Sequence, residues 1–312
     1  MEYYIGIDAG GTKTEAALTD QTGHILHRHR GKGCNPMDIG VPAVKELILS
    51  VVEALTAVSP NIPASLYGGI AGLDRIDVDL DAFLAKHTDI PIIRTEDDGC
   101  NMISGMLGHV DGCGMVCGTG SSLFVRIEGR PLVHIGGLGY LIDTGGSGFE
   151  LARDGLKRAY RYLDGRGEQT LLVEQFSNAL HKDLKHAFLD LYSEGRPFIA
   201  SLAHVVFECA TAGDAVACAL LEEGSFKLAE LTHAAAKHFD GDFTVVMNGG
   251  IFHAYPHYAE AVRKKASPRA NMILADVPAI YGAFVEALWQ GNVRADEETR
   301  RQFMADYERI IT

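Results

Sequence analysis

A glycine-tipped ribbon near the N-terminus constrains the fold of this chain more than any other stretch. Apolar residues alternate with glycine from Ile5 to Ile7, an acid follows at Asp8, and a Gly-Gly turn leads through Thr12–Thr14 into a second apolar run. This pattern predicts two antiparallel strands whose tip offers backbone N–H groups to an anion, because glycine has no Cβ to block the approach. An ordinary β-hairpin with a tight Gly-Gly turn explains the same residues.

The same order of features returns at residues 115–135. A strand pattern reaches Cys117, a Gly-Thr-Gly turn follows, and hydroxyl residues lead into two further strands. The duplication predicts an α/β chain of two lobes that hold a nucleotide triphosphate from both sides of a cleft. We expect the N-terminal lobe to span residues 1–113 together with a returning helix at about 294–312, and the C-terminal lobe to span 114–293.

Candidate nucleotide-binding residues lie at the two tips and at a third glycine pair. That pair follows the strand predicted at 243–247 and precedes a helix, where a flat adenine can lie against bare backbone. The full set is Gly10, Gly11, Thr12, Lys13, Thr14, Gly118, Thr119, Gly120, Gly249 and Gly250. Asp8 stands where Mg²⁺ bound between two phosphates needs a carboxylate, so it is the candidate metal ligand.

An acidic cluster, Glu96-Asp97-Asp98, ends a predicted strand and opens a helix that runs to about Leu107. One acid can cap the helix and meet its dipole, but three in a row exceed what a cap needs. In a two-lobed phosphotransferase, one carboxylate must accept the proton of the attacking hydroxyl group. The candidate bases are Asp98 first and Asp97 second.

Charge and composition limit the kinds of binding partner that we expect for this chain. The formal net charge of −13 argues against a nucleic-acid surface. No apolar run approaches 18 residues and no secretory signal is present, so we expect a cytoplasmic protein with no membrane partner. The six cysteines lack the spacing of a disulfide framework or zinc ribbon, which predicts buried free thiols.

The chain resembles the sugar-kinase/Hsp70/actin superfamily, and more narrowly the N-acetylglucosamine kinase and BadF/BadG/BcrA/BcrD-type ATPase family. The resemblance rests on four ordered motifs along nearly the whole length, at Asp8–Thr14, Gly118–Ser121, Gly249-Gly250 and Pro278–Ala283. It implies two ribonuclease H-like lobes in an actin-like ATPase fold, ATP and Mg²⁺ as cofactors, and a base at Asp97 or Asp98.

The resemblance also implies a set of sugar contacts. These are Asn35, the turn at Gly72, Thr119 or Ser121, and the loop around Gly139 and Asp143. That loop departs from the family pattern, because family kinases carry Gly-Asp-Glu-Gly-Ser where this chain has Ile142-Asp143-Thr144-Gly145-Gly146-Ser147. The missing glutamate puts the specificity of this loop, and the role of Asp143, in question.

Three functions follow from these expectations. The first is an ATP-dependent kinase for an amino sugar such as N-acetylglucosamine or glucosamine, working as a homodimer. The second is an ATP-driven activator of a radical dehydratase or reductase, in which Cys117 would contribute to an iron–sulfur cluster. The third is a non-catalytic sugar sensor.

Overall fold

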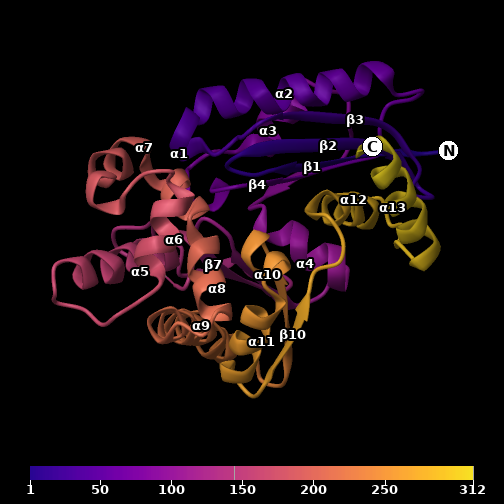
Figure 1. Ribbon diagram of the computed structural model, residues 1–312. Helices are drawn as coiled ribbons and strands as arrows, with labels where there is room; N and C mark the ends of the chain where they lie inside the picture. The colour runs from indigo at the N-terminus through magenta and orange to yellow at the C-terminus, as the bar shows by residue number, and fades with distance from the viewer. Residues whose placement is uncertain (144, 312) are drawn as a thin grey trace. The chain divides into compact units, whose positions relative to one another are not determined.

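The computed structural model describes residues 1–143 and 145–311, and the contacts among them separate two compact units. The first unit contains residues 1–112, 126–132 and the chain from 275 onward. The second unit contains residues 113–125 and 133–274. Figure 1 labels the elements of both units along the chain.

The first unit is built on a five-stranded mixed sheet. Its strands are β1 (Tyr3–Ala9), β2 (Lys13–Asp20), β3 (Ile25–Lys32), β4 (Ser65–Ile70) and β5 (Ile93–Glu96). They lie in the order β3-β2-β1-β4-β5, with β1–β2–β3 antiparallel and β4 and β5 parallel to β1. The predicted hairpin is confirmed, because Ala9 pairs with Thr14 across its tip.

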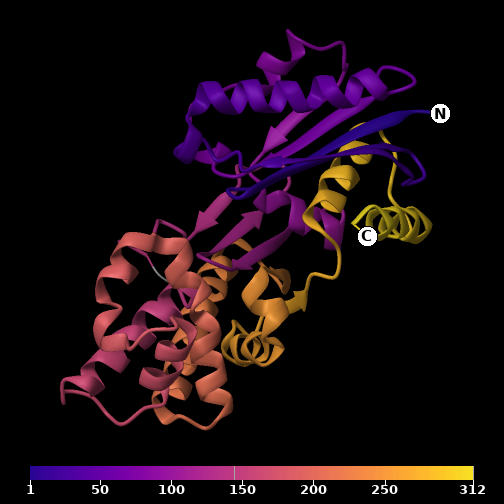
Figure 2. The ribbon, with the colours of Figure 1, turned by 45° about the horizontal axis from the view of Figure 1, so that its top comes forward.

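Side-chain alternation along β1 divides the core of this unit between two faces. Ile5 and Ile7 pack with the apolar residues of α2 (Val41–Val58) and α3 (Leu80–Ala85). Tyr4 packs on the opposite face with α12 (Ala279–Gln290) and α13 (Glu297–Ile311). Figures 1 and 2 show α2 along one side of the sheet and α12 along the other.

The position of α12 differs from the expectation that residues up to 293 belong to the C-terminal lobe. Residues 280–288 of this helix are all buried, and the helix packs on β1, β4 and α4 (Gly99–Leu107) of the first unit. The approach is as close as backbone allows: a Cβ on Gly6 would lie 2.8 Å from the backbone nitrogen of Phe284. The expected helix at 294–312 is confirmed as α13, and residue 312 lies outside the described residues.

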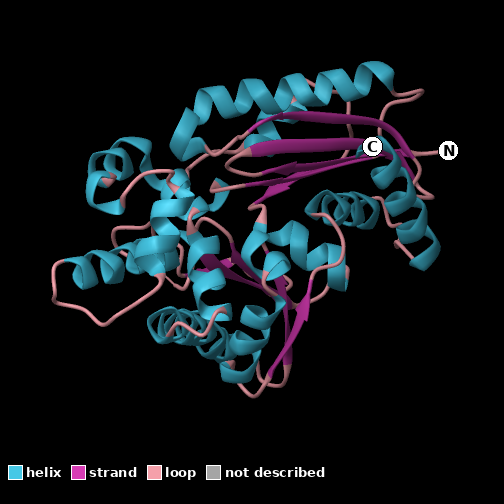
Figure 3. Cartoon of the chain, viewed as in Figure 1, coloured by secondary structure: helices cyan, strands magenta, loops and turns pink. Residues whose placement is uncertain are grey.

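The second unit repeats the sheet of the first. Its strands are β6 (Gly112–Cys117), β7 (Ser121–Arg126), β8 (Val133–Ile135), β9 (Phe243–Asn248) and β10 (Ala270–Leu274). Their order is β10-β9-β6-β7-β8, with β9 parallel to β6 and to β10 and with β7 antiparallel to β8. In both sheets the first strand is central, a hairpin extends to one side and two later strands extend to the other, which confirms the predicted ribonuclease H-like architecture. Figure 3 shows the strands and the helices around them in separate colours.

Helices fill most of the rest of the second unit. They are α5 (Gly148–Leu163), α6 (Leu172–Ala179), α7 (Phe188–Ser201), α8 (Ala203–Thr211), α9 (Ala215–Ala235), α10 (Gly250–Ala254) and α11 (Pro256–Lys265). Within residues 1–143 and 145–311, no single helix is long and apolar enough to cross a membrane; α8 and the segment from Ala215 to His238 reach that length and composition only as a pair, bent by 119°.

A buried carboxylate on α12 joins three elements of the first unit. Glu286 is 2% exposed, and its two oxygens accept hydrogen bonds from Arg126 and from His109, each at 2.7 Å. Ser104 of α4 also donates to Glu286. A buried charge of this kind is tolerated because it is paired and hydrogen-bonded.

Replacing this carboxylate should destabilise the first unit selectively. Glu286→Ala leaves the Arg126 guanidinium largely buried without its partner, and we expect a loss of about 3–5 kcal/mol of unfolding free energy. Trp289 is the single tryptophan and stacks on His109 at 3.5 Å, so its fluorescence during urea denaturation reports on this region. The control Glu297→Ala breaks an exposed pair with Arg300 and should cost below about 1 kcal/mol; equal losses in the two variants would contradict the expectation.

Candidate active site

The tip of the β1–β2 hairpin presents backbone N–H groups outward. The Gly10 nitrogen donates to the Lys13 carbonyl at 2.9 Å, and the Gly10 carbonyl accepts from the Cys34 nitrogen at 2.9 Å. Because the C=O and N–H of one planar peptide point in opposite directions, the Gly11 N–H is directed away from Cys34. Gly11 and Thr12 are exposed, so the tip is open to solvent, and anion binding there stays a prediction.

Asp8 is the second-last residue of β1, just before this tip, and Asn101 of α4 fixes its carboxylate. The Asn101 amide donates to Asp8 Oδ1 at 2.7 Å, which leaves the second carboxylate oxygen for another ligand. Burial raises the pKa of Asp8 to about 6, although the hydrogen bond from Asn101 opposes this rise. Asn101 can reach Asp8 only because residue 69 is glycine, since a Cβ there would lie 2.3 Å from the Asn101 amide.

Asp97 is held by backbone on both of its oxygens. One oxygen accepts from the Gly72 nitrogen at 2.9 Å and the other from the Gly99 nitrogen at 3.0 Å. The side chain is 4% exposed, and burial raises its pKa to about 6. These bonds join the turn after β4 to the start of α4, a role that already uses both oxygens.

Asp98 occupies the N-cap position of α4 without capping it through its side chain. Its Oδ2 lies 3.8 Å from the position that a Cβ on Gly10 would take, so the carboxylate reaches the hairpin tip. Burial, followed by the charges of Asp97 and Asp8, raises the pKa of Asp98 well above its usual range. The carboxyl groups of Asp8, Asp97 and Asp98 therefore lie near enough to influence one another's charge where β1 and β5 end.

Asn35 and Gly72 lie together beside the same tip. A Cβ on Gly72 would lie 3.3 Å from the Asn35 side-chain oxygen, and one on Gly11 would lie 4.0 Å from its amide nitrogen. The Asn35 oxygen caps α1 (Pro36–Ile39) by accepting from the Met37 nitrogen at 2.8 Å. The structure therefore brings the predicted residues Gly10, Gly11, Asn35, Gly72, Asp97 and Asp98 into one cluster within the first unit.

Two predicted nucleotide contacts of this unit have other partners. Thr14 is fully buried and its hydroxyl donates to the Lys32 carbonyl at 2.7 Å, because strand alternation turns it away from the exposed tip. Lys13 pairs with the buried Glu15 at 3.2 Å. In this conformation neither side chain is directed to the tip, whereas the sequence analysis expected both Lys13 and Thr14 to contact the nucleotide.

The second hairpin tip is organised like the first. The Gly118 nitrogen donates to the Gly120 carbonyl at 2.9 Å. The carbonyls of Gly118 and Thr119 accept from the first amides of α5, at 2.8 Å from Gly148 and 3.2 Å from Phe149. By the same peptide geometry, the N–H groups of Thr119 and Gly120 point away from α5, where they can meet an anion.

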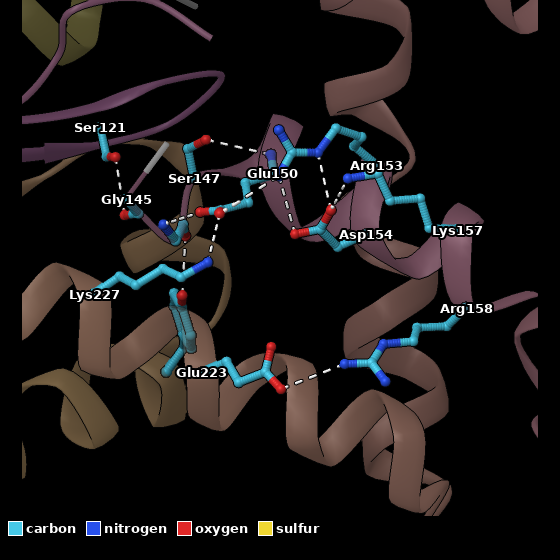
Figure 4. Close-up of polar contacts among 12 residues, drawn as sticks. Ser121, Gly145, Ser147, Glu150, Arg153, Asp154, Lys157, Arg158, Glu223 and Lys227 are labelled. Atoms are coloured by element: carbon cyan, nitrogen blue, oxygen red, sulfur yellow. Dashed lines mark hydrogen bonds and ion pairs between the residues drawn. The ribbon is translucent and has the colours of Figure 1, made fainter. Parts of the chain in front are cut away.

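The start of α5 is fixed by a capping pair that the sequence reasoning missed. The Ser147 hydroxyl accepts from the Glu150 nitrogen at 3.4 Å, and the Glu150 carboxylate accepts from the Gly146 nitrogen at 2.5 Å. Lys227 pairs with the same carboxylate at 2.7 Å, as Figure 4 shows. The Ser-x-x-Glu spacing at 147–150 is the signal of a capping box and could have identified this feature.

The predicted adenosine glycines lie at the junction of β9 and α10. Gly249 has φ of 112° and packs on the end of β6, where a Cβ would lie 2.3 Å from the Cys117 carbonyl oxygen. Asn248 holds the turn by accepting from the Gly249 nitrogen at 2.8 Å. Gly250 faces open space, so this junction leaves bare backbone beside the second tip.

The remaining predicted sugar contacts turn toward their own loop. Ser121 donates to the Gly145 carbonyl at 2.9 Å (Figure 4). Asp143 accepts from the Leu138 nitrogen at 3.3 Å, and its own nitrogen donates to the Gly139 carbonyl at 2.9 Å. Both side chains thereby shape the loop 136–147, of which residue 144 lies outside the described residues.

Two five-stranded sheets of one topology, each with a glycine-tipped hairpin, define the actin-like ATPase fold. The chain belongs to the BadF/BadG/BcrA/BcrD ATPase family, whose model matches residues 5–287.

Individual relatives agree with this assignment. The N-acetyl-D-glucosamine kinase of Dictyostelium discoideum is 26% identical over 92% of this chain and 98% of that protein. The N-acetylmuramic acid/N-acetylglucosamine kinase of Clostridium acetobutylicum is 27% identical over 73% of this chain and 77% of that protein. A solved structure from Chromobacterium violaceum shares the fold, with a TM-score of 0.67 and 23% identity over 91% of this chain and 98% of that one.

The carboxyl cluster should make stability fall as pH rises. A carboxyl group whose pKa is raised by folding stabilises the folded state, and this contribution is complete below its unfolded-state pKa of about 3.9. The contribution is lost as the pH rises through the folded-state pKa. We therefore expect Asp98→Asn to raise the free energy of unfolding at pH 8 and to leave it nearly unchanged at pH 4. Urea denaturation at the two pH values measures this difference.

Asp97→Asn is the matched control for this test. An asparagine has one side-chain oxygen, so one of the amides of Gly72 and Gly99 loses its acceptor, at a cost of about 1–3 kcal/mol. Destabilisation of both variants at pH 8 would show that Asp98, too, is held by structural bonds.

Proposed function

We propose that this protein is an ATP-dependent kinase that phosphorylates a hydroxyl group of an amino sugar of the N-acetylglucosamine or glucosamine type. The observation that carries the proposal is the position of Asp98, a carboxylate with a raised pKa beside both the Gly10 tip and Asp8. The amino-sugar kinases among the relatives support the substrate class.

In this proposal Asp98 is the general base. A sugar hydroxyl group gives its proton to the Asp98 carboxylate as its oxygen attacks the terminal phosphate of ATP. A base works best when its pKa lies near the working pH. Burial and the charges of Asp97 and Asp8 raise the pKa of Asp98 toward that range. Asp97 positions the base by tying the start of α4 to the Gly72 turn.

Each hairpin tip is proposed to bind phosphate within its own unit. The Gly11 N–H supplies a fixed donor in the first unit; the N–H groups of Thr119 and Gly120 do so in the second, where Gly249-Gly250 supply bare backbone for adenine. The acceleration then comes from positioning and charge stabilisation.

Asp8 is proposed to hold Mg²⁺. Within residues 1–143 and 145–311, no three His, Cys, Asp or Glu residues are grouped to bind a metal without further ligands. One carboxylate with a free oxygen fits Mg²⁺, which takes most of its ligands from phosphates and water. Bound there, the ion would offset phosphate charge, and Asn101 keeps the carboxylate in place.

Sugar recognition is assigned to Asn35 and the Gly72 turn. The Asn35 amide nitrogen is near Gly11 and has no hydrogen-bond partner among the described residues, so it can donate to a sugar oxygen. We further propose that the enzyme is cytoplasmic and that it is a homodimer. Light scattering of the purified protein tests the homodimer.

The alternative functions have less support. An electron-transfer activator needs accessible thiolates for its cluster, but the Cys117 side chain is fully buried, and burial raises the pKa of its thiol well above the usual range. A purified protein with visible absorbance bands would favour the activator. Binding of sugar without any turnover of ATP would favour the sensor.

A coupled assay of ADP release tests the proposal directly. Glucosamine, N-acetylglucosamine, N-acetylmuramate and glucose are supplied in turn with MgATP. We expect turnover with at least one amino sugar above the rate with water alone; no turnover with any of them would contradict the proposal.

The role of the base has its own prediction. Asp98→Asn removes the proton acceptor and should lower kcat by roughly 10²–10⁴-fold, while the Kd for sugar changes little. The control Asp77→Asn alters an exposed acid of the same unit and should leave kcat unchanged. An unchanged kcat in Asp98→Asn would move the base elsewhere.

A further inference from the structure

Arg196 of α7 carries a positive charge that the second unit does not use internally. Among the described residues its guanidinium has no ion pair and no hydrogen bond, and its buried Nε has no acceptor. An unsatisfied buried donor costs free energy, and in a chain of net charge −13 an arginine without a carboxylate partner calls for a ligand.

The same guanidinium lies over the second hairpin tip. Arg196 Nη2 is 2.7 Å from the position that a Cβ on Gly120 would occupy, so the guanidinium lies directly against the backbone of the tip. The N–H groups of Thr119 and Gly120 face away from α5, as described above. A fixed cation and outward backbone donors are thus gathered at one turn, which is the donor set that phosphate prefers.

Aromatic rings and the local backbone hold the side chain in this position. The Arg196 carbon Cζ lies 5.5 Å from the centroid of the Tyr140 ring and 5.9 Å from that of Phe149. Contact with ring faces leaves the N–H edges of a guanidinium free. Gly195, with φ of 77° and ψ of −171°, interrupts α7 directly before Arg196, and Pro197 follows it.

We propose that Arg196 is an anion-binding residue of the second tip and that its anion is the β- or γ-phosphate of ATP. The inference rests on the proposed kinase function. A carboxylate on the sugar is the other anion that this chemistry would recognise, and the experiment below separates the two sources.

The test compares the wild-type protein with Arg196→Gln, Arg196→Lys and a matched control, Arg158→Gln. Arg158 lies on α5 and, unlike Arg196, has a carboxylate partner, Glu223, at 3.5 Å (Figure 4). Isothermal titration calorimetry measures the Kd for MgATP and for AMP, and thermal unfolding checks that each variant is folded.

We expect Arg196→Gln to raise the Kd for ATP by about 10- to 100-fold and to leave the Kd for AMP unchanged, because AMP lacks both outer phosphates. The Kd of Arg196→Lys for ATP should lie between those of Arg196→Gln and the wild type, since lysine keeps the charge but lacks the planar guanidinium group. Arg158→Gln should match the wild type for both nucleotides.

Other results would overturn the assignment. Unchanged ATP binding in a folded Arg196→Gln protein contradicts it while leaving the kinase function intact. Equal losses of affinity for ATP and AMP would show that Arg196 has a structural role. A loss confined to turnover of N-acetylmuramate would show that Arg196 binds the carboxylate of the sugar. Failure of the wild-type protein to bind ATP would overturn the proposed function itself.

Discussion

The backbone contact between α4 and α12 fixes the acidic half of the candidate site. A Cβ on Gly282 would lie 1.7 Å from the Asn101 carbonyl oxygen, so the two helices meet without side chains between them. Because α12 also packs on β1, the helix that begins after Asp98 and the strand that carries Asp8 near its end rest on one common support. The spacing of the carboxyl groups depends on that support.

Both hairpin tips use one arrangement to present donors. In each, the glycine carbonyl is tied back to a following segment, Cys34 in the first unit and the start of α5 in the second. The peptide plane then directs the next N–H outward with no contribution from side chains. This explains why Thr14 can serve the fold while the tip of its hairpin remains open to a ligand.

Sequence reasoning recovered the duplicated sheets, both tips and the acidic cluster, because each is encoded by local patterns of glycine and apolar residues. It missed Asn101 and Arg196, whose roles depend on contacts between segments distant in sequence. It also separated α12 from the first unit, since a helix with apolar residues on nearly every face does not show in its sequence which sheet buries it. The backbone hydrogen bonds that occupy both oxygens of Asp97 were not foreseen either, because neighbouring acids look alike in sequence.

The residues at positions 69 and 101 cannot change independently of each other. Any side chain at position 69 would fill the space that the Asn101 amide occupies, so a substitution in β4 removes the residue that orients Asp8. Homologues with a larger residue at 69 must therefore have a smaller one at 101 and another way to fix the acid. The two positions should covary, although neither belongs to a glycine-rich loop.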